Sequence, residues 1–464
     1  MRPAYRAAVP LPEPAVNLRP LACALLLAAS CAATAADWTL ADVMPLSART
    51  KDRVAPGTTA ANVNRFGFFS DLTFDARTGT WYALSDRGPG GGVIGYATRV
   101  QQLLIVTHPL TGELLHKPVV LRTILFTDRS GKPFNGLNPT LLNGSPATLG
   151  NSFDPEGLAV GRNGHLFVAD EYGPSLYEFD ARGRFIRAFE IPGNLRPRQA
   201  DGQANYTDGR PTIATGRQDN RGFEGLAFNA SGTRLYGVLQ DPLVNEGANG
   251  DGRRSRFVRI VEFDPRTGTS TRQFAYALES ITTLNAIDPS TEDDFSATNQ
   301  GRSIGLSAIT AVSDDEFIVL ERDNRGLGVE VTAAPLHKRL YRIDLRGATD
   351  IAGLSLAGTN ELPAGVVPVA KRPEADLLAA LKSVGSTVPE KLEGVAFGPR
   401  LFTGGRVALV GSDNDYSVTQ TGAGEQFDVC VNPDTGARAQ VPLDTPCPAG
   451  SELIPGYLLS FKVR

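Results

Sequence analysis

The sequence has little excess of charge of either sign. Its 464 residues include 46 Lys and Arg against 50 Asp and Glu, a formal net charge of −4. A nucleic-acid-binding surface needs clustered positive charge, so we expect no nucleic-acid partner. Histidine is scarce, with four residues, and neither histidine nor cysteine has the spacing of a zinc site. The sequence also contains neither a phosphate-binding P-loop nor a dinucleotide fingerprint.

Long apolar runs are missing too, with one exception near the N-terminus. The stretch "LACALLLAASCAATAADW" follows three arginines and contains an Ala-x-Ala site, the pattern of a secretory signal peptide. We therefore predict a signal peptide over 1–35, cleaved near Ala35, and a mature chain, 36–464, that forms one domain in the periplasm or outside the cell. Lipoprotein processing at Cys31 is a weaker alternative. No transmembrane helix is expected, because no other segment approaches the roughly 18 apolar residues it needs.

Only four cysteines are present, and Cys23 and Cys31 fall within the expected signal peptide. Cys430 and Cys447 remain in the mature chain. An oxidising compartment favours a bond between two cysteines that close a short loop, so we predict a Cys430–Cys447 disulfide.

Glycine (49) and proline (32), in contrast, are abundant and separate short apolar runs. The stretch "DPEGLAVGRNGHLFVADEYGPSLYEFDARGRFIRAFEIP" (154–192) reads as four strands joined by three tight turns. Four antiparallel strands in so short a segment match one blade of a β-propeller.

Similar units recur along the chain, at 69–88, 222–243, 306–326 and 392–417. Such recurrence is the signature of a repeat architecture. We predict an all-β fold: a β-propeller of six blades with four antiparallel strands each, five of them readable as copies. Pairing of "WTLADVMPL" near the N-terminus with "GYLLSFKV" at the C-terminus would close the sixth blade. Two stacked β-sandwiches would account for the strands but not for the recurrence.

Two segments interrupt the repeats. The polar stretch 193–221 is long for a connection in a compact domain, which is typical of a lid or a binding loop. The stretch "PEADLLAALKSV" (373–384) has apolar residues at helical spacing after a proline and predicts one short inserted helix.

Each unit opens its first strand with a polar residue: Ser70, Glu156, Glu224, Ser307 or Glu393. First strands line the central channel of a propeller, so the three glutamates should converge on one axis. Converging carboxylates repel one another unless a cation or basic groups compensate them. Because oxygen ligands suit a hard cation, we predict a Ca²⁺ site formed by Glu156, Glu224, Glu393 and, at the end of a second strand, Asp413.

The second strands also end in polar groups. As candidates for catalysis we take Asp170, Glu171, Glu321 and Arg322. The competing interpretation is that each of these residues only ends its strand and makes hydrogen bonds within its own blade.

Basic residues flank the same strand ends. We predict that an anionic substrate such as a phosphate ester is bound by Arg87, Arg221, Arg325 and Lys391. Arginine is suited to this task because its guanidinium can donate two parallel hydrogen bonds. The same residues could instead be internal partners of the acids, and the sequence leaves both interpretations open.

The segment "GRSIG" (301–305) has the G-x-S-x-G pattern of serine hydrolases. That motif needs its serine at a turn from a strand into a helix. Ser303 is expected to precede an inner strand instead, so a catalytic serine is weakly supported.

The segments "SFDPEGLAVGRNGHLFVADEYGPSLYEFDARGR" and "NRGFEGLAF" resemble the secreted bacterial phytase-like proteins, which are described as having esterase-like activity. The segments "LERDNRG" and "GSDNDYS" extend the resemblance over nearly the whole mature chain. It implies an exported β-propeller related in architecture to calcium-dependent phytases. It also implies that the glutamate of each Glu-Gly pair helps to hold a divalent cation.

We therefore expect a secreted ester hydrolase, dependent on Ca²⁺ and acting on small anionic esters, phosphoric rather than carboxylic. Its site would lie at the mouth of the propeller channel, and the protein would be a monomer. The alternative is a non-catalytic periplasmic binding or scaffold propeller whose Ca²⁺ is structural.

Overall fold

The computed structural model describes most of the chain. The described residues are 38–54, 64–140, 151–207, 209–288, 290–421 and 425–464, and they belong to one compact unit, 36–464. The expected signal peptide, its cleavage site at Ala35, and Cys23 and Cys31 lie outside the described residues. No helix in the described part of the chain combines the length and the apolar character that crossing a bilayer would require.

Strands dominate, as predicted, and the described residues form six four-stranded antiparallel sheets. Two sheets are β2 (Asp71–Asp75), β3 (Thr80–Leu84), β4 (Arg99–Leu104), β5 (Val119–Leu125), and β6 (Pro155–Val160), β7 (Leu166–Asp170), β8 (Ser175–Phe179), β9 (Phe185–Ala188). Two more are β10 (Phe223–Phe228), β11 (Leu235–Leu239), β12 (Phe257–Asp264), β13 (Thr269–Ala277), and β14 (Ile304–Ala311), β15 (Glu316–Asp323), β16 (Lys338–Asp344), β17 (Ala370–Asp376). In all four sheets the strands pair in chain order, so each is a meander like the one read from 154–192.

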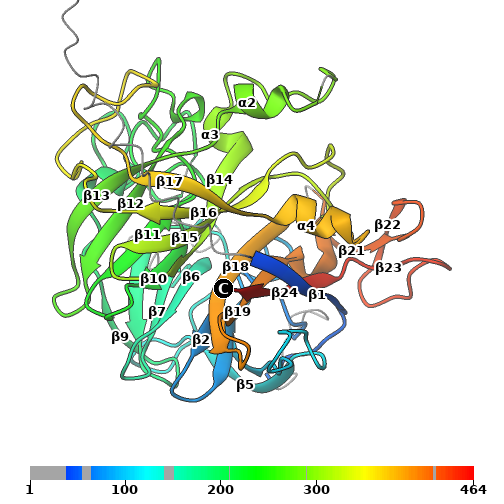
Figure 1. Ribbon diagram of the computed structural model, residues 1–464. Helices are drawn as coiled ribbons and strands as arrows, with labels where there is room; N and C mark the ends of the chain where they lie inside the picture. Colours follow the sequence, from blue (N-terminus) through cyan, green and yellow to red (C-terminus); the bar gives the residue numbers. More distant parts are fainter. Residues whose placement is uncertain (1–37, 55–63, 141–150, 208, 289, 422–424) are drawn as a thin grey trace, which may run out of the picture. The chain divides into compact units, whose positions relative to one another are not determined.

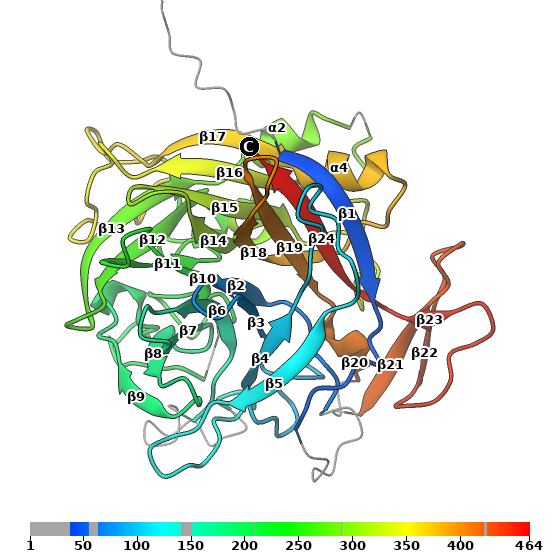
Figure 2. The same cartoon turned by 60° about the horizontal axis from the view of Figure 1, so that its bottom comes forward.

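The fifth sheet joins the two ends of the described chain. It consists of β18 (Lys391–Arg400), β19 (Arg406–Asp413), β24 (Gly456–Val463) and β1 (Trp38–Leu46). Trp38 lies opposite Val463, and its indole packs edge-on against Phe461. The blue β1 and the red β24 lie side by side in Figures 1 and 2. The predicted pairing of the two ends is confirmed, but it completes the sheet of β18 and β19, which is the readable copy at 392–417 and not a separate blade.

Five first strands form a ring. Strands β2, β6, β10, β14 and β18 each contact the next, and β18 contacts β2. Figure 2 shows these strands near the middle and β5, β9, β13, β17 and β1 at the rim. Apolar side chains fill the space between neighbouring sheets, for example Phe223, Phe263 and Phe317. The fold is therefore a β-propeller, as predicted.

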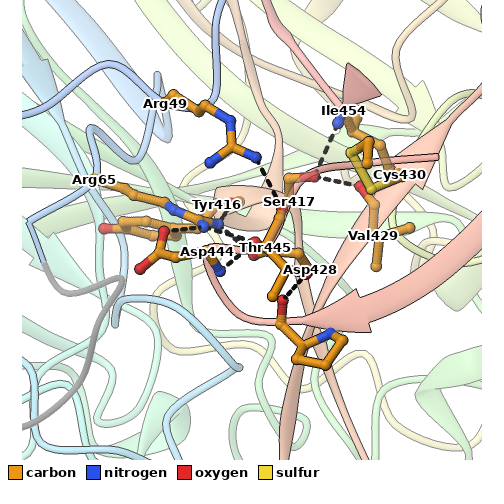
Figure 3. Close-up of a disulfide and its surroundings, with 12 residues drawn as sticks. Arg49, Arg65, Tyr416, Ser417, Asp428, Val429, Cys430, Asp444, Thr445 and Ile454 are labelled. Atoms are coloured by element: carbon orange, nitrogen blue, oxygen red, sulfur yellow. Dashed lines mark hydrogen bonds and ion pairs between the residues drawn. A yellow bond between two sulfur atoms is a disulfide. The ribbon is translucent and has the colours of Figure 1, made fainter. Parts of the chain in front are cut away.

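The sixth sheet is inserted between β19 and β24. Its strands are β20 (Val418–Gln420), β21 (Gln426–Val431), β22 (Arg438–Pro442) and β23 (Glu452–Leu453). Cys430 on β21 forms the predicted disulfide with Cys447. Figure 3 shows Arg65, from the segment before β2, reaching this sheet. The Arg65 guanidinium is fully buried and lies 2.6 Å from Asp428 and 2.7 Å from Asp444, so an internal ion pair holds the insertion against the rest of the unit.

Helices in the described part of the chain are few and short. The α-helices are α2 (Ile281–Asn285), α3 (Gln300–Ser303) and α4 (Leu377–Ser383), and η1 (Gly193–Leu195), η2 (Gly252–Arg254) and η3 (Asp415–Ser417) are single 3₁₀ turns. The predicted helix over 373–384 is α4, but it begins later than expected. Pro373 belongs to β17, and the helix starts after Asp376, whose carboxylate accepts a hydrogen bond from the Ala379 amide as an N-cap.

Replacing Arg65 by methionine should destabilise the protein strongly. The substitution leaves Asp428 buried without its partner, and breaking one side of a buried ion pair costs about 3–5 kcal/mol. Arg49→Met is the matched control, because the exposed Arg49 makes one hydrogen bond to the Thr445 carbonyl of the same insertion. Urea unfolding of both variants measures the difference. Equal losses would mean that the buried pair does not fix the insertion.

Candidate functional site

The glutamates of the three Glu-Gly pairs stand at β-bulges. The pairing of β6 with β7 shifts between Pro155 and Gly157, so Glu156 has no residue directly opposite. Equivalent shifts flank Glu224 and Glu393. A bulge leaves its extra residue outside the ladder and redirects the side chain.

The glycines of these pairs set the spacing of the inner strands. A Cβ on Gly157 would lie 2.9 Å from the backbone of Gly225, and one on Gly225 would lie 3.0 Å from the backbone of Ala308. A Cβ on Gly394 would likewise lie 3.0 Å from a backbone atom of β2. Any side chain at these positions would push neighbouring strands apart. The repeated Glu-Gly pair therefore combines close strand packing with a carboxylate aimed away from the sheet.

A cavity of about 140 Å³ lies where the glutamates converge. Six carboxyl groups line it, from Asp86, Glu156, Glu171, Glu224, Glu390 and Glu393. Four cationic groups line it as well, from Arg87, Arg221, Arg322 and Lys391. The structure thus brings eight of the predicted site residues to one place, with a formal excess of two negative charges. Elsewhere along the inner strands most lining residues are apolar, such as Leu158, Leu226 and Val395.

Two groups of three carboxylates could each hold a cation, and they share Asp86. One group is Asp86, Asp154 and Glu156, and the other is Asp86, Asp413 and Asp415; within each group the oxygens lie within 4.8 Å of one another. Glu156 makes no hydrogen bond or ion pair with any other described residue. Its carboxylate is therefore available to a ligand.

Glu224 and Glu393 are arranged differently from Glu156, because an arginine lies between them. A nitrogen of Arg322 is 2.5 Å from Glu393 and 3.9 Å from Glu224. Gln240 donates a hydrogen bond to one oxygen of Glu224, and the other oxygen is buried without a partner among the described residues. Of the four acids predicted as ligands, Glu224 and Glu393 thus lie in the part of the cavity that Arg322 compensates, and Glu156 lies in the part around Asp86. Asp413 does not line the cavity, although it belongs to the second carboxylate group with Asp86.

Burial and neighbouring carboxylates raise the pKa of several of these acids. Burial, reinforced by Asp154, raises the pKa of Glu156 well above its usual value, and burial with Glu171 does the same to the pKa of Glu224. The pKa of Glu171 is raised to about 8 and that of Asp413 to about 7, in both cases mainly by burial. Without further positive charge nearby, part of this cluster holds protons at neutral pH.

Two of the predicted substrate-binding residues have close carboxylate partners. Arg87 lies 3.0 Å from Asp154, and Lys391 lies 2.5 Å from Asp415. These contacts correspond to the interpretation that the basic residues are internal partners of the acids.

Arg221 is held more loosely. Its Nη1 donates a hydrogen bond to Gln240, but its nearest carboxylates are Asp241 at 3.4 Å and Glu171 at 3.8 Å, and its Nε has no hydrogen-bond acceptor among the described residues. About a fifth of its side chain is exposed. Of the cations in the cavity, Arg221 is therefore the one best placed to exchange its contacts for an anionic ligand.

Asp170 lies outside the cavity, although Glu171 lines it. The Asp170 carboxylate accepts hydrogen bonds from the amides of Asp154 and Gly173 and from the Ser175 hydroxyl. Burial raises its pKa to about 7. Because it binds the backbone of Asp154, Asp170 positions one member of the acidic cluster.

Glu321 also lies outside the cavity, on the opposite face of β15 from Arg322. Its carboxylate contacts His337 at 2.8 Å, Lys371 at 2.6 Å and the Tyr276 hydroxyl at 2.6 Å. Burial alone would raise the pKa of Glu321, but Lys371 and His337 outweigh it and lower the pKa to about 2. This network joins two neighbouring sheets, because Tyr276 belongs to β13, so it extends beyond the single blade of the competing interpretation.

Arg325 and Ser303 do not reach the cavity either. The Arg325 guanidinium lies over the ring of Phe295, 3.7 Å from its centroid, and 3.8 Å from Asp293. Ser303 is the last residue of α3 and leads into β14. That order, helix before strand, is the reverse of the strand-turn-helix context that a nucleophilic serine requires.

The sequence interpretation did not select three acids of the cluster: Asp86, Asp154 and Asp415. Asp86 follows β3 at the position that Glu171 occupies after β7, so the alignment of second strands contained it. Asp154 precedes Glu156 by two residues, and Asp415 follows Asp413 by two. Short spacing to a predicted ligand is the signal that could have found both.

The arrangement fits a hard divalent cation. Its close donors are all carboxylate oxygens, which Ca²⁺ prefers. The cavity carries the formal excess of two negative charges that such an ion would offset. A buried oxygen of Glu224 and one of Glu171, both in the lining, accept no hydrogen bond from the described residues.

Known proteins resemble this chain to different degrees. A protein of Arthroderma benhamiae, described as an uncharacterized secreted protein, is 29% identical over 310 residues, which cover 57% of this chain and 58% of the relative. The chain thus spans less than two thirds of that relative. Among solved structures, the Dos1 propeller shares 8% identity over 86% of this chain and 68% of its own, with a TM-score of 0.28. A luciferin-regenerating enzyme shares 12% identity over 86% and 94%, with a TM-score of 0.29.

A sequence profile gives the stronger result. The profile of the phytase-like family, described as "esterase-like activity of phytase", matches residues 64–416. This range begins just before β2, includes every residue of the cavity and ends after Asp415. The chain belongs to the phytase-like family.

Proposed function

We propose that the protein is a secreted ester hydrolase that depends on Ca²⁺ held in the cavity at the mouth of the propeller channel. The proposal rests on one arrangement. Two groups of three carboxylates, which share Asp86, lie beside the loosely held Arg221 and the buried Glu171, whose pKa is raised. Membership of a family described by esterase-like activity supports the reaction class. A relative described as secreted supports the location.

The cation would be held by Asp86, Asp154 and Glu156, with Asp413 and Asp415 as a second set. When bound, the ion supplies positive charge that stabilises negative charge developing on an ester oxygen. The bulge at Glu156 and the hydrogen bond from the Asp154 amide to Asp170 fix two of these ligands before any ion arrives. Prearranged ligands of this kind lower the cost of ordering the site.

The residues opposite these acids favour an anionic ester. Arg221 can turn from Asp241 and Glu171 towards a phosphate group and donate two hydrogen bonds to it. Burial raises the pKa of Glu171, and as water attacks the phosphorus the protonated form of Glu171 can deliver its proton to the departing alcohol oxygen. A carboxylic ester offers Arg221 no comparable anion, so we propose phosphoric esters as the substrate class.

A second function is favoured by the contacts of Arg87 and Lys391. Both already have carboxylate partners at 3.0 Å or less, as they would in a purely structural site. The alternative is therefore a non-catalytic binding or scaffold propeller in which Ca²⁺ only stabilises the channel mouth.

Calcium should raise the melting temperature of the purified protein, and EDTA should reverse the effect, because a ligand that binds only the folded state stabilises it. Glu156→Gln should weaken Ca²⁺ binding at least about tenfold while keeping the fold, since Glu156 has no protein partner to lose. Glu316→Gln is the matched control, at the end of β15 remote from Arg322. Calorimetric titration with Ca²⁺ measures both. Unchanged binding by Glu156→Gln would remove the proposed site.

Hydrolysis of 4-nitrophenyl phosphate should require Ca²⁺ and exceed that of 4-nitrophenyl acetate. Glu171→Gln should lower kcat for phenyl phosphate about 100-fold or more, the contribution of a general acid. It should lower kcat for 4-nitrophenyl phosphate much less, because 4-nitrophenolate leaves without a proton. Ser303→Ala should leave turnover unchanged, because its serine lies outside the cavity. Spectrophotometric rates with Ca²⁺ and with EDTA provide the measurement. No turnover together with a large fall in Tm under EDTA would favour the structural alternative.

A further inference from the structure

A second and larger cavity lies outside the channel site. Its volume is about 360 Å³, within the roughly 300–1,000 Å³ of small-molecule sites. It lies between the second sheet and the 193–221 loop, which the sequence suggested as a lid or binding loop. None of the described residues lines both this cavity and the channel cavity.

Aromatic rings form much of the lining. Tyr177 comes from β8, Phe189 follows β9, Tyr172 stands in the turn between β7 and β8, and Tyr206 comes from the 193–221 loop. Tyr172 and Phe189 are buried, whereas Tyr177 and Tyr206 are half-buried. Rings from several segments around one cavity offer faces and edges against which another aromatic ring can stack.

The lining contains two charged residues, and one of them is already satisfied. Both oxygens of Asp170 accept hydrogen bonds, from the Asp154 and Gly173 amides and from the Ser175 hydroxyl. The Arg196 guanidinium, just after η1, has neither a hydrogen-bond acceptor nor an ion-pair partner among the described residues. The cavity therefore combines aromatic walls with one uncommitted positive charge.

We propose that this cavity binds a small aromatic anion, with its ring between the tyrosines and its carboxylate or similar group on Arg196. The guanidinium can donate two parallel hydrogen bonds to such a group. An aromatic ligand can stack against the rings of the cavity, whereas an aliphatic acid of the same size cannot. The site is independent of the proposed hydrolysis, although the Tyr172 ring also lies 5.9 Å from the Arg87 guanidinium of the channel site.

The test is calorimetric titration of the purified protein in EDTA with 4-nitrobenzoate. Two probes each lack one feature: cyclohexanecarboxylate has no aromatic face, and 4-nitrobenzyl alcohol has no charge. Only 4-nitrobenzoate should bind measurably below about 10 mM, within the affinity expected for so small a ligand. No binding of 4-nitrobenzoate, or equal binding of cyclohexanecarboxylate, would overturn the proposal.

Variants of the loop identify the place of binding. Arg196→Gln should weaken binding about tenfold or more, the loss expected for a charge-assisted contact. Arg198→Gln should have no effect, because Arg198 lies on the same loop but bonds to the Gly202 carbonyl and does not line the cavity. Tyr206→Ala should also weaken binding, and circular dichroism verifies that each variant is folded. Unchanged affinity in Arg196→Gln would place the ligand elsewhere and refute the assignment.

One further variant separates this site from the hydrolytic one. Glu156→Gln, which lies in the channel, should bind 4-nitrobenzoate as the unmodified protein does. Loss of binding in that variant would mean that the probe occupies the channel, and the second site would be rejected whether or not the protein is an esterase.

Discussion

Close packing of five inner strands around one axis is the constraint on which the other features depend. The strands approach so closely that Gly157, Gly225 and Gly394 cannot carry a side chain. The bulge beside each glycine then places a glutamate outside the hydrogen-bonded ladder, where the channel is the space left to it. The acidic cavity is thus a by-product of how the ring closes, and its charge has to be balanced by other parts of the molecule.

That balance is uneven across the cavity. On one side Arg322 lies between Glu224 and Glu393, so guanidinium charge is built into the fold. On the other side Asp86 belongs to both groups of three carboxylates. In these groups Arg87 pairs closely with Asp154, and Lys391 pairs closely with Asp415. Buried like charges can take up protons, recruit a metal ion or destabilise the fold. The asymmetry explains why we infer a cation near Asp86 rather than at the centre of the three glutamates.

The sequence predicted the propeller, the pairing of the two ends and the convergence of the glutamates, because each rests on a repeated local pattern. It did not predict the sixth sheet, whose strands β20–β23 repeat nothing else in the chain. It also grouped Glu321 with Arg322 and Asp170 with Glu171. Neighbours on a strand point to opposite faces, so within each pair one residue reaches the cavity and the other enters a separate network. Asp86 lies close to Asp154 and Asp413, which belong to other repeats. The pattern within one repeat therefore cannot predict these contacts.

The pairing of β1 with β24 gives the protein an order of assembly. Strand β19 pairs with β24, and β1 joins this sheet through β24, which follows β19 in the sequence. Until residues 456–463 have been synthesised, β19 therefore keeps an unpaired edge, and the apolar Trp38 lacks Phe461. Unpaired edges invite association with other chains. A nascent copy is consequently open to association at this edge until β24 has been synthesised, and a companion that shields the edge would matter during that interval.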